Sequence, residues 1–294
     1  IPGAAPHLIQ PGSALPEITE QVFLNATSQS GYAGLPLVEI NGIYGGLTIT
    51  GGGSRVNGLA MNNASGYGLT LSASGGNAIE ANQIAGISIN SSGNFVNGNV
   101  ISGSIGDGIA IASGANNNMI GVSAGNVINS NAGYGISESN AGNNQISNNM
   151  ISSNFLGGVK VTNSTGMINQ NTVTGNTGYG ISLNSVNGYN ISDNEVSINT
   201  LGGIYLSNST GNLSGNSISG NLNFGMSLAM ANNNTLAENE IFGNSSHGLL
   251  INGSDNDITY NTIYNNGTAG SGSGIFVESG TNNSILYNSI YDNS

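Results

Sequence analysis

A glycine followed by an apolar residue, any residue and a second apolar residue recurs through most of this 294-residue chain. The phrase first occurs as Gly46-Leu47-Thr48-Ile49 and starts again at Gly68, Gly86, Gly108, Gly135, Gly158, Gly180, Gly203, Gly225, Gly248 and Gly274. Successive glycines in the middle of the chain are mostly 22 or 23 residues apart, as from Gly180 to Gly203. A fixed period of this length is the sequence signature of stacked structural repeats. The repeat therefore restricts the fold to a solenoid.

Within each phrase the two apolar residues are separated by one residue, which is the period of a short strand with one face inward. One such coil cannot bury its apolar face alone, so stacking must supply the core. The sequence predicts an all-β fold, a single-stranded right-handed parallel β-helix (β-solenoid) of about 10–11 coils of roughly 22–23 residues. We expect residues 1–45 to form an N-terminal leader or cap with the first coil, and residues 46–294 to form the repeats.

Asparagine also recurs once per coil between the glycines. We interpret this column as a structural ladder, because the side-chain amide can donate to one neighbouring coil and accept from the other, and because Asn tolerates the left-handed conformation of a tight turn. Its clearest members are Asn149, Asn171, Asn194, Asn216, Asn239 and Asn261. A second column follows five residues later, from Asn154 and Asn176 to Asn293.

Strong bases are almost absent, since Arg55 and Lys160 stand against 14 acidic residues and give a net charge of −12. Nucleic acid is an unsuitable partner, because phosphate binding needs clustered Lys and Arg. An anionic membrane surface is disfavoured for the same reason, and no apolar stretch reaches the length of a membrane-spanning helix. The chain has no cysteine, so neither a disulfide nor a thiolate metal site is possible.

The repeat phrases resemble the parallel β-helix repeats of pectin-lyase-like secreted and surface proteins of bacteria and archaea. The stretch from Leu15-Pro16-Glu17-Ile18 to Leu37-Val38-Glu39-Ile40 looks like a segment that precedes the first full coils in large secreted proteins of this kind. The resemblance implies a cap at this end, a location outside the cell or on its surface, and a chain that is one module or a processed portion of a larger protein. It specifies the fold far more strongly than the activity.

Polysaccharide cleavage is the enzymatic alternative that such a fold raises. A lyase needs a strong base, but Arg55 lies near the amino-terminal end and Lys160 has no acidic neighbour in the adjacent coils, so we expect both to be surface residues. A hydrolase needs two carboxylates at a fixed separation. An acidic patch in coils two steps apart, about 9.6 Å by the strand spacing, provides candidates in Asp193, Glu195, Glu238 and Glu240. We favour a solvated acidic face over catalysis there, and we assign no catalytic residue.

No metal or cofactor site is predicted. His7 and His247 each lack a second ligand nearby in the repeat. Asp255 and Asp257 could hold Ca²⁺ together with loop carbonyls, but the Ca²⁺-binding repeat of β-rolls is absent. Glu138 occupies an inward slot where other coils carry Leu, Ile or Val. Because the preceding interval is 27 residues long, from Gly108 to Gly135, we expect a local bulge that turns Glu138 outward.

Aromatic residues gather in the last coils. Ordinary stacking within the fold explains them, and the alternative is a contact surface for a sugar or a protein. The candidate surface consists of Phe242, Tyr260, Tyr264, Phe276, Tyr287 and Tyr291. The chain also ends at Ser294 just before another Gly-apolar phrase would begin, which indicates an uncapped end open to strand addition.

These observations favour a non-catalytic extracellular or cell-surface structural protein, a rigid rod that assembles with itself into a filament or surface layer. The expected partner is therefore another copy of the chain, with glycans as a further possibility. The alternative is a carbohydrate-binding or polysaccharide-cleaving β-helix module that uses the late aromatic columns and the acidic patch.

Overall fold

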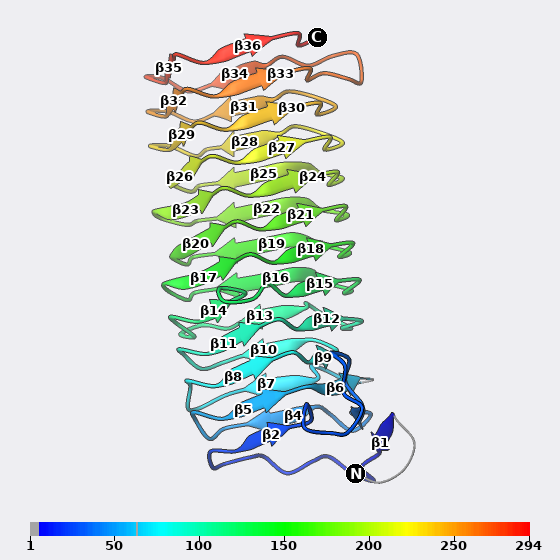
Figure 1. Cartoon of the computed structure of the whole chain (residues 1–294). Helices are drawn as coiled ribbons and strands as arrows, with labels where there is room; N and C mark the ends of the chain where they lie inside the picture. Colours follow the sequence, from blue (N-terminus) through cyan, green and yellow to red (C-terminus); the bar gives the residue numbers. More distant parts are fainter. Residues whose placement is uncertain (1–5, 63) are drawn as a thin grey trace. The chain divides into compact units, whose positions relative to one another are not determined.

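The computed structural model describes residues 6–62 and 64–294, and its regular elements in these ranges are β-strands. The chain divides into two compact units, Ile1–Met150 and Ile151–Ser294. In each unit the chain visits three parallel sheets in turn, here called B, C and A, and strands of one sheet are stacked coil on coil (Figure 1). The predicted all-β, right-handed parallel β-helix is confirmed. No helix long and apolar enough to cross a lipid bilayer occurs among the described residues.

The first unit contributes five strands to sheet B. Sheet B contains β4 (Leu47–Ile49), β7 (Leu69–Leu71), β10 (Ile87–Ile89), β13 (Ile109–Ile111) and β16 (Tyr134–Ser139). Sheet C contains β2 (Phe23–Asn25), β5 (Arg55–Asn57), β8 (Ala78–Glu80), β11 (Phe95–Asn97), β14 (Met119–Ile120) and β17 (Asn144–Ser147). Sheet A contains β1 (His7–Ile9), β3 (Val38–Asn41), β6 (Leu59–Asn62), β9 (Gln83–Ile84), β12 (Val100–Ser102) and β15 (Val127–Asn129).

The second unit contributes six strands to sheet B, which has 11 strands in all. This number agrees with the predicted 10–11 coils. Sheet B contains β19 (Gly157–Thr162), β22 (Tyr179–Asn184), β25 (Gly202–Ser207), β28 (Met226–Ala229), β31 (Leu249–Asn252) and β34 (Ile275–Ser279). Sheet C contains β20 (Gly166–Asn169), β23 (Tyr189–Ser192), β26 (Gly211–Ser214), β29 (Thr235–Ala237), β32 (Asp257–Thr259) and β35 (Ser284–Leu286). Sheet A contains β18 (Met150–Ser152), β21 (Thr172–Thr174), β24 (Glu195–Ser197), β27 (Ser217–Ser219), β30 (Glu240–Phe242), β33 (Thr262–Tyr264) and β36 (Ser289–Tyr291).

The glycine of each phrase stands where neighbouring coils leave no room for a side chain. A Cβ atom added to Gly180 would lie 2.4 Å from Val196 Cγ1 and 2.7 Å from Asn199 Nδ2. After the glycine, the apolar residues of β22 and β25 pair in register as Ile181 with Ile204, and both are fully buried. The glycine therefore allows neighbouring coils to pack closely at the start of each buried strand.

The predicted asparagine column lies inside the coils as a hydrogen-bonded ladder. The side-chain oxygen of Asn216 accepts from the backbone N–H of Asn194 (3.1 Å) and from Asn194 Nδ2 (2.9 Å). In turn, the backbone N–H and the Nδ2 of Asn216 both donate to Asn239 Oδ1, and Nδ2 also donates to the Ile191 carbonyl (2.9 Å). In the first unit Asn126 donates to Asn149 in the same way. Each buried amide is thus bonded to both neighbouring coils.

The left-handed residue of the turn differs from the expected one. It is the residue before the ladder asparagine, such as Asp193 (φ 56°), Glu238 (φ 57°) or Tyr260 (φ 58°). The asparagine itself is used for hydrogen bonding between coils. A third ladder, which the sequence pattern did not separate from the other two, includes Asn94, Asn118 and Asn144 in the first unit, and Asn234, Asn256 and Asn283 in the second.

The prediction that Glu138 turns outward is wrong. Glu138 is 1% exposed, pairs in register with Ile111, and accepts a hydrogen bond from Asn144 Nδ2 (3.1 Å). The extra residues of the long coil lie in the two turns at 112–118 and 121–126, before and after β14, so they leave the strand register at Glu138 unchanged. The hydrogen bond from Asn144 gives the buried carboxylate of Glu138 a polar partner, so the carboxylate does not have to reach solvent.

Candidate functional site

The aromatic residues of the last coils form separate stacks. Phe242, Tyr264 and Tyr291 share the outer face of sheet A, with successive ring centroids 5.1 Å apart and planes inclined by 4°. Tyr260 and Tyr287 stack at 5.3 Å in the turn before that sheet. Phe276 lies on β34 of sheet B and stacks on His247 at 4.7 Å. The candidate contact surface is therefore three stacks on different parts of the second unit.

Stacking determines which aromatic faces a ligand can reach. Both faces of the Tyr264 ring are covered, one by Phe242 and the other by Tyr291. The opposite face of Phe242 is directed toward the coil below, where its partner in register is Ser219. Because serine is short, this is the place on the stack where a sugar ring could pack against an aromatic face.

The four acidic residues also fall into two columns. Glu195 and Glu240 begin strands β24 and β30, and both pair in register with Ser217 of the coil between them. Asp193 and Glu238 lie in the preceding turns, with Gly215 of β26's turn in the intervening coil. The carboxylate of Asp193 lies over Gly215, where an added Cβ would be 2.6 Å from Asp193 Oδ1. Glu195 and Glu240 lie on strands of one sheet, so they are better placed to act together on one ligand. Asp193 and Glu238 lie in turns and are less well placed to do so.

We define the glutamate site as Glu195, Ser217, Glu240, Phe242 and Tyr264. Glu195 and Glu240 are both exposed, and they are two strand spacings apart, about 9.6 Å. Ser217 leaves only a hydroxymethyl group between them. This is the separation of the backbones, and the flexible side chains can bring the two carboxyl groups into the range of roughly 6.5–9.5 Å that admits a water beside a glycosidic bond.

Tyr264 orients one of the two carboxylates. Its hydroxyl donates to Glu240 Oε1 at 3.0 Å. Tyr264 belongs to the next coil, where it continues the column of Phe242 rather than that of Glu240. This hydrogen bond, together with desolvation and the nearby charge of Glu240, raises the pKa of Tyr264 above its ordinary value of 10.0. Glu195 accepts no side-chain hydrogen bond from any other described residue. The two carboxylates therefore differ in their hydrogen-bond partners, since Glu240 has the Tyr264 hydroxyl.

The raised pKa of Tyr264 leads to a direct test of this hydrogen bond. A folded-state pKa above the unfolded one means that the hydrogen bond contributes stability at pH below about 10 and loses it as pH rises through the folded pKa. We expect Glu240→Gln to lower the pKa of Tyr264 toward 10.0, because the substitution removes the carboxylate that opposes phenolate formation. Tyrosine ¹³Cζ chemical shifts, with Tyr264→Phe for assignment, measure the change. An unchanged titration in Glu240→Gln would contradict the interaction, and Glu238→Gln serves as the matched control.

The outer face of sheet B in the second unit carries a separate aromatic cluster. The ring of Tyr179 stacks on Tyr205 at 4.6 Å and lies 5.8 Å from Phe224. Gly202 makes this possible, since its Cβ would lie 2.7 Å from the Phe224 ring. Lys160 is on the same sheet, in register with Ser182 of the next coil. Burial raises the pKa of Tyr179, but the cluster contains no carboxylate that could act with Lys160.

His247, Asp255 and Asp107 each accept a hydrogen bond from a neighbouring coil. His247 Nδ1 accepts the backbone N–H of Ser273 (2.9 Å), and Asp255 Oδ1 accepts from Asn282 Nδ2 (3.1 Å). Asp107 accepts the backbone N–H of Tyr134 at 2.7 Å and the Ser137 hydroxyl at 2.5 Å. Residues 6–62 and 64–294 contain no group of three His, Cys, Asp or Glu side chains that could hold a metal ion.

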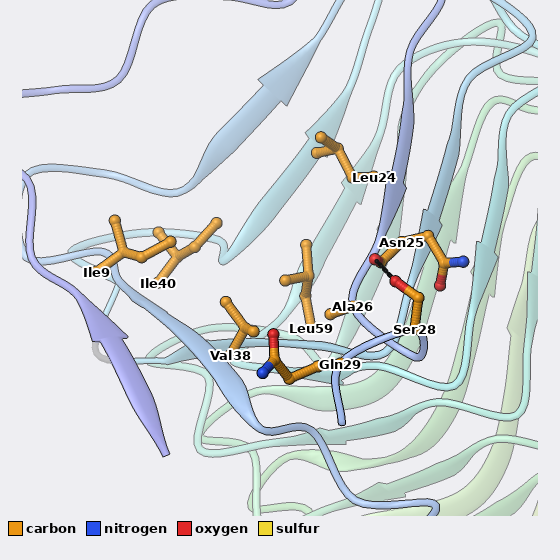
Figure 2. Close-up of a pocket in the computed structure, with 9 residues that line it drawn as sticks. All are labelled: Ile9, Leu24, Asn25, Ala26, Ser28, Gln29, Val38, Ile40 and Leu59. Carbon is orange, nitrogen blue, oxygen red and sulfur yellow. Dashed lines mark hydrogen bonds between the residues drawn. The ribbon is translucent and has the colours of Figure 1, made fainter. Parts of the chain in front are cut away.

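A cavity of 270 Å³ in the first unit is lined mainly by apolar side chains of β1, β2, β3 and β6, which point toward one another in Figure 2. Its polar border consists of Asn25, Ser28 and Gln29, and it contains no charged side chain. Without a titratable group, this cavity cannot carry out acid–base chemistry.

Comparison with known proteins agrees with this architecture. The model of the family described as "Right handed beta helix region" matches residues 157–294. No curated protein sequence matches the chain. The periplasmic alginate epimerase AlgG resembles the structure with a TM-score of 0.69 at 14% identity, over 96% of this chain and 76% of AlgG.

Two further solved structures are similar. The A-module of the mannuronan C-5 epimerase AlgE6 from Azotobacter vinelandii has a TM-score of 0.58 at 17% identity, over 79% of this chain and 71% of the module. The Agl-KA catalytic domain has a TM-score of 0.56 at 14% identity, over 95% of this chain and 60% of that domain. At these identities the similarity establishes the fold.

The sequence-based prediction of a non-catalytic, self-assembling structural rod is wrong. The similar structures are two epimerases of polysaccharides and a catalytic domain, and none of the three is named as a filament or surface-layer protein. The acidic patch was interpreted as a solvated face because the spacing of residues along the sequence does not distinguish a pair of exposed surface carboxylates from a pair that can hydrolyse a glycosidic bond. The carbohydrate-directed alternative agrees better with these comparisons.

Proposed function

We propose that this protein is a polysaccharide-processing enzyme that hydrolyses glycosidic bonds of a neutral glycan at the glutamate site. The observation that carries the proposal is the pair Glu195 and Glu240, exposed on one sheet face and separated by the short side chain of Ser217. The similarity of the fold to carbohydrate-processing enzymes supports it.

The chemistry assigns one role to each carboxylate. Glu195 donates a proton to the glycosidic oxygen as the bond from that oxygen to the anomeric carbon breaks. Glu240 accepts a proton from a water molecule whose oxygen forms the new bond to the anomeric carbon from the opposite face. The Tyr264 hydroxyl, 3.0 Å from Glu240 Oε1, holds the accepting carboxylate in position. Strands two coils apart leave room between the carboxyl groups for this water, so the product has inverted anomeric configuration.

The substrate is a neutral glycan because the glutamate site has no cation. Lys160 lies on sheet B, whereas the two glutamates lie on sheet A. The chain has a net charge of −12, which repels a polyanionic polymer such as alginate. The open face of Phe242 offers a surface on which an uncharged pyranose can stack.

The same proposal includes location and partners. A polysaccharide substrate places the enzyme outside the cytoplasm, and the similar AlgG is named as periplasmic. The partner is a glycan chain, and no metal or cofactor takes part in the proposed reaction.

Release of reducing ends from laminarin, amylose and mannan, with alginate and polygalacturonate for comparison, tests the function. We expect hydrolysis of at least one neutral polymer, with inverted products by ¹H NMR. We expect Glu195→Gln to lower the rate about 10³-fold, because a general acid contributes on the order of 10²–10⁴-fold. Asp255→Asn, which changes an exposed turn carboxylate, is the control. Activity confined to the anionic polymers, or full activity in Glu195→Gln, would contradict the proposal.

A further inference from the structure

A second cavity, of 420 Å³, lies in the first unit between the coils of β2 and β5. It is lined by Gln21, Val22, Phe23, Gly53 and Arg55. Phe23 and Arg55 begin their strands and pair in register. The volume falls within the range of small-ligand sites, roughly 300–1,000 Å³.

Arg55 is fixed at this cavity by an ion pair. Its Nε and Nη2 both donate to Glu80 Oε2, at 2.9 and 2.5 Å. The guanidinium carbon lies 5.8 Å from the centroid of the Phe23 ring, in cation–π geometry. The charge of Arg55 is therefore balanced by Glu80, while its planar N–H groups keep a defined orientation.

Gln21 is fixed in a similar way. Its Nε2 donates to the Gly53 carbonyl at 2.7 Å, which leaves the amide oxygen as an acceptor. Gly53 has φ of 68°, and a Cβ there would lie 3.1 Å from Gln21 Nε2. A side chain at position 53 would thus crowd the amide that borders the cavity. The cavity combines positioned donors and acceptors without net charge.

Phe23 adds an accessible aromatic surface. Its side chain is 59% exposed, and β2 is the end strand of sheet C. The rings of the sheet A stack cover one another, whereas no aromatic ring stacks on Phe23 among the described residues. An aromatic ring beside planar polar side chains is the combination that recognises a pyranose, whose C–H face packs on the ring while its hydroxyls bond to the polar groups.

We infer that this cavity is a second, non-catalytic glycan-binding site that takes one or two sugar units of a neutral oligosaccharide. The inference rests on the proposed function for the class of ligand. An apolar ligand would leave the hydrogen-bonding groups of Gln21 and Arg55 unused. An anionic sugar would compete with Glu80 for a guanidinium that is already paired.

The absence of tryptophan from the chain provides a specific probe. In Phe23→Trp the new indole is the single tryptophan, so its emission reports binding at the cavity directly. We expect laminarihexaose, maltohexaose or cellohexaose to shift this emission saturably, and trigalacturonate not to do so. Phe95→Trp is the matched control, because Phe95 begins β11 on the same sheet, is 42% exposed, and lines neither cavity. Its emission should not change.

Two further variants measure the contribution of each group by calorimetric titration. Phe23→Ala is expected to weaken binding at this site about 2- to 12-fold, because the sugar loses the aromatic face on which it stacks. Arg55→Met should weaken it to a similar or greater degree. An unchanged thermal midpoint shows that the fold is retained, and Phe23→Trp remains the folded variant that preserves the aromatic surface. Absence of an emission change with every neutral oligosaccharide, or a response to trigalacturonate alone, would overturn the inference.

The readouts separate this inference from the proposed function. Phe23→Ala should hydrolyse a soluble oligosaccharide with unchanged kcat, whereas Glu195→Gln should retain the cavity's affinity. Loss of kcat with intact cavity binding is thus specific to the glutamate site. An enzyme that hydrolyses neutral glycans without any signal from Phe23→Trp would refute the second site and leave the first intact.

Discussion

Glu240→Gln is expected to lower kcat for a neutral polysaccharide about 10³-fold, within the range of roughly 10²–10⁴ for loss of a general base. The amide has nearly the same shape as the carboxylate and can still accept from the Tyr264 hydroxyl, 3.0 Å away in the native protein. It cannot take a proton from the attacking water. The loss should therefore appear in kcat, with KM nearly unchanged, because binding in the ground state is retained.

The control for Glu240→Gln is Glu238→Gln. Glu238 is an exposed carboxylate two residues away, but its backbone lies in the left-handed turn before the strand. We expect its replacement to change kcat less than twofold. Steady-state kinetics on a soluble neutral oligosaccharide measures both variants. Equal losses in the two variants would indicate a general effect of negative charge and would remove the reason for assigning Glu240 as the base.

The sequence was sufficient to predict the fold because each coil repeats the same physical requirements. A Cβ at Gly180 would collide with Val196, and the following apolar residues must meet their equivalents in the next coil. These conditions recur with the period of the coil, so they are visible as columns of residues. Where the period changed, the prediction failed. The added residues of the long interval before Glu138 were expected to form a bulge at its strand, but they lie in the turns at 112–118 and 121–126.

The candidate site was predicted only in part for a different reason. Position in a column predicts which residues share a face, and it correctly places Glu195 and Glu240 two coils apart with Ser217 between them. The hydrogen bond from Tyr264 to Glu240 joins two different columns of adjacent coils. Such a diagonal contact depends on side-chain rotamers, which the repeat does not specify.

The cavity at Phe23 was not visible in the sequence for a third reason. Gln21 and Phe23 lie before the first regular Gly-apolar phrase, so no column includes them. Arg55 was identified as a rare base, but its ion pair with Glu80 is a diagonal contact, since the register of β5 and β8 pairs Arg55 with Ala78 and Asn57 with Glu80. Residues outside the repeat therefore require the structure before their neighbours can be assigned.

Asn216→Ala should be among the most destabilising single substitutions in the second unit, with a loss of about 3–6 kcal/mol in the free energy of unfolding. Removal of the amide takes a hydrogen-bond partner from five groups. They are the backbone N–H and Nδ2 of Asn194, the Ile191 and Ser214 carbonyls and Asn239 Oδ1. The Asn194 N–H, which loses its acceptor, costs on the order of 1–3 kcal/mol, and the other lost hydrogen bonds and the cavity left beside alanine add to that loss.

The matched control is Asn212→Ala, four residues earlier. Asn212 is exposed on the outer face of β26, so its replacement should change the unfolding free energy by about 0.5 kcal/mol or less. Urea denaturation followed by circular dichroism measures both variants. Because each coil contacts mainly its neighbours, the loss in Asn216→Ala could also separate the transition into two phases, with the coils beside β26 melting first. Equal urea midpoints for the two variants would show that solvent can satisfy the groups that Asn216 bonds, and would rule out a role of the asparagine ladder in holding neighbouring coils together.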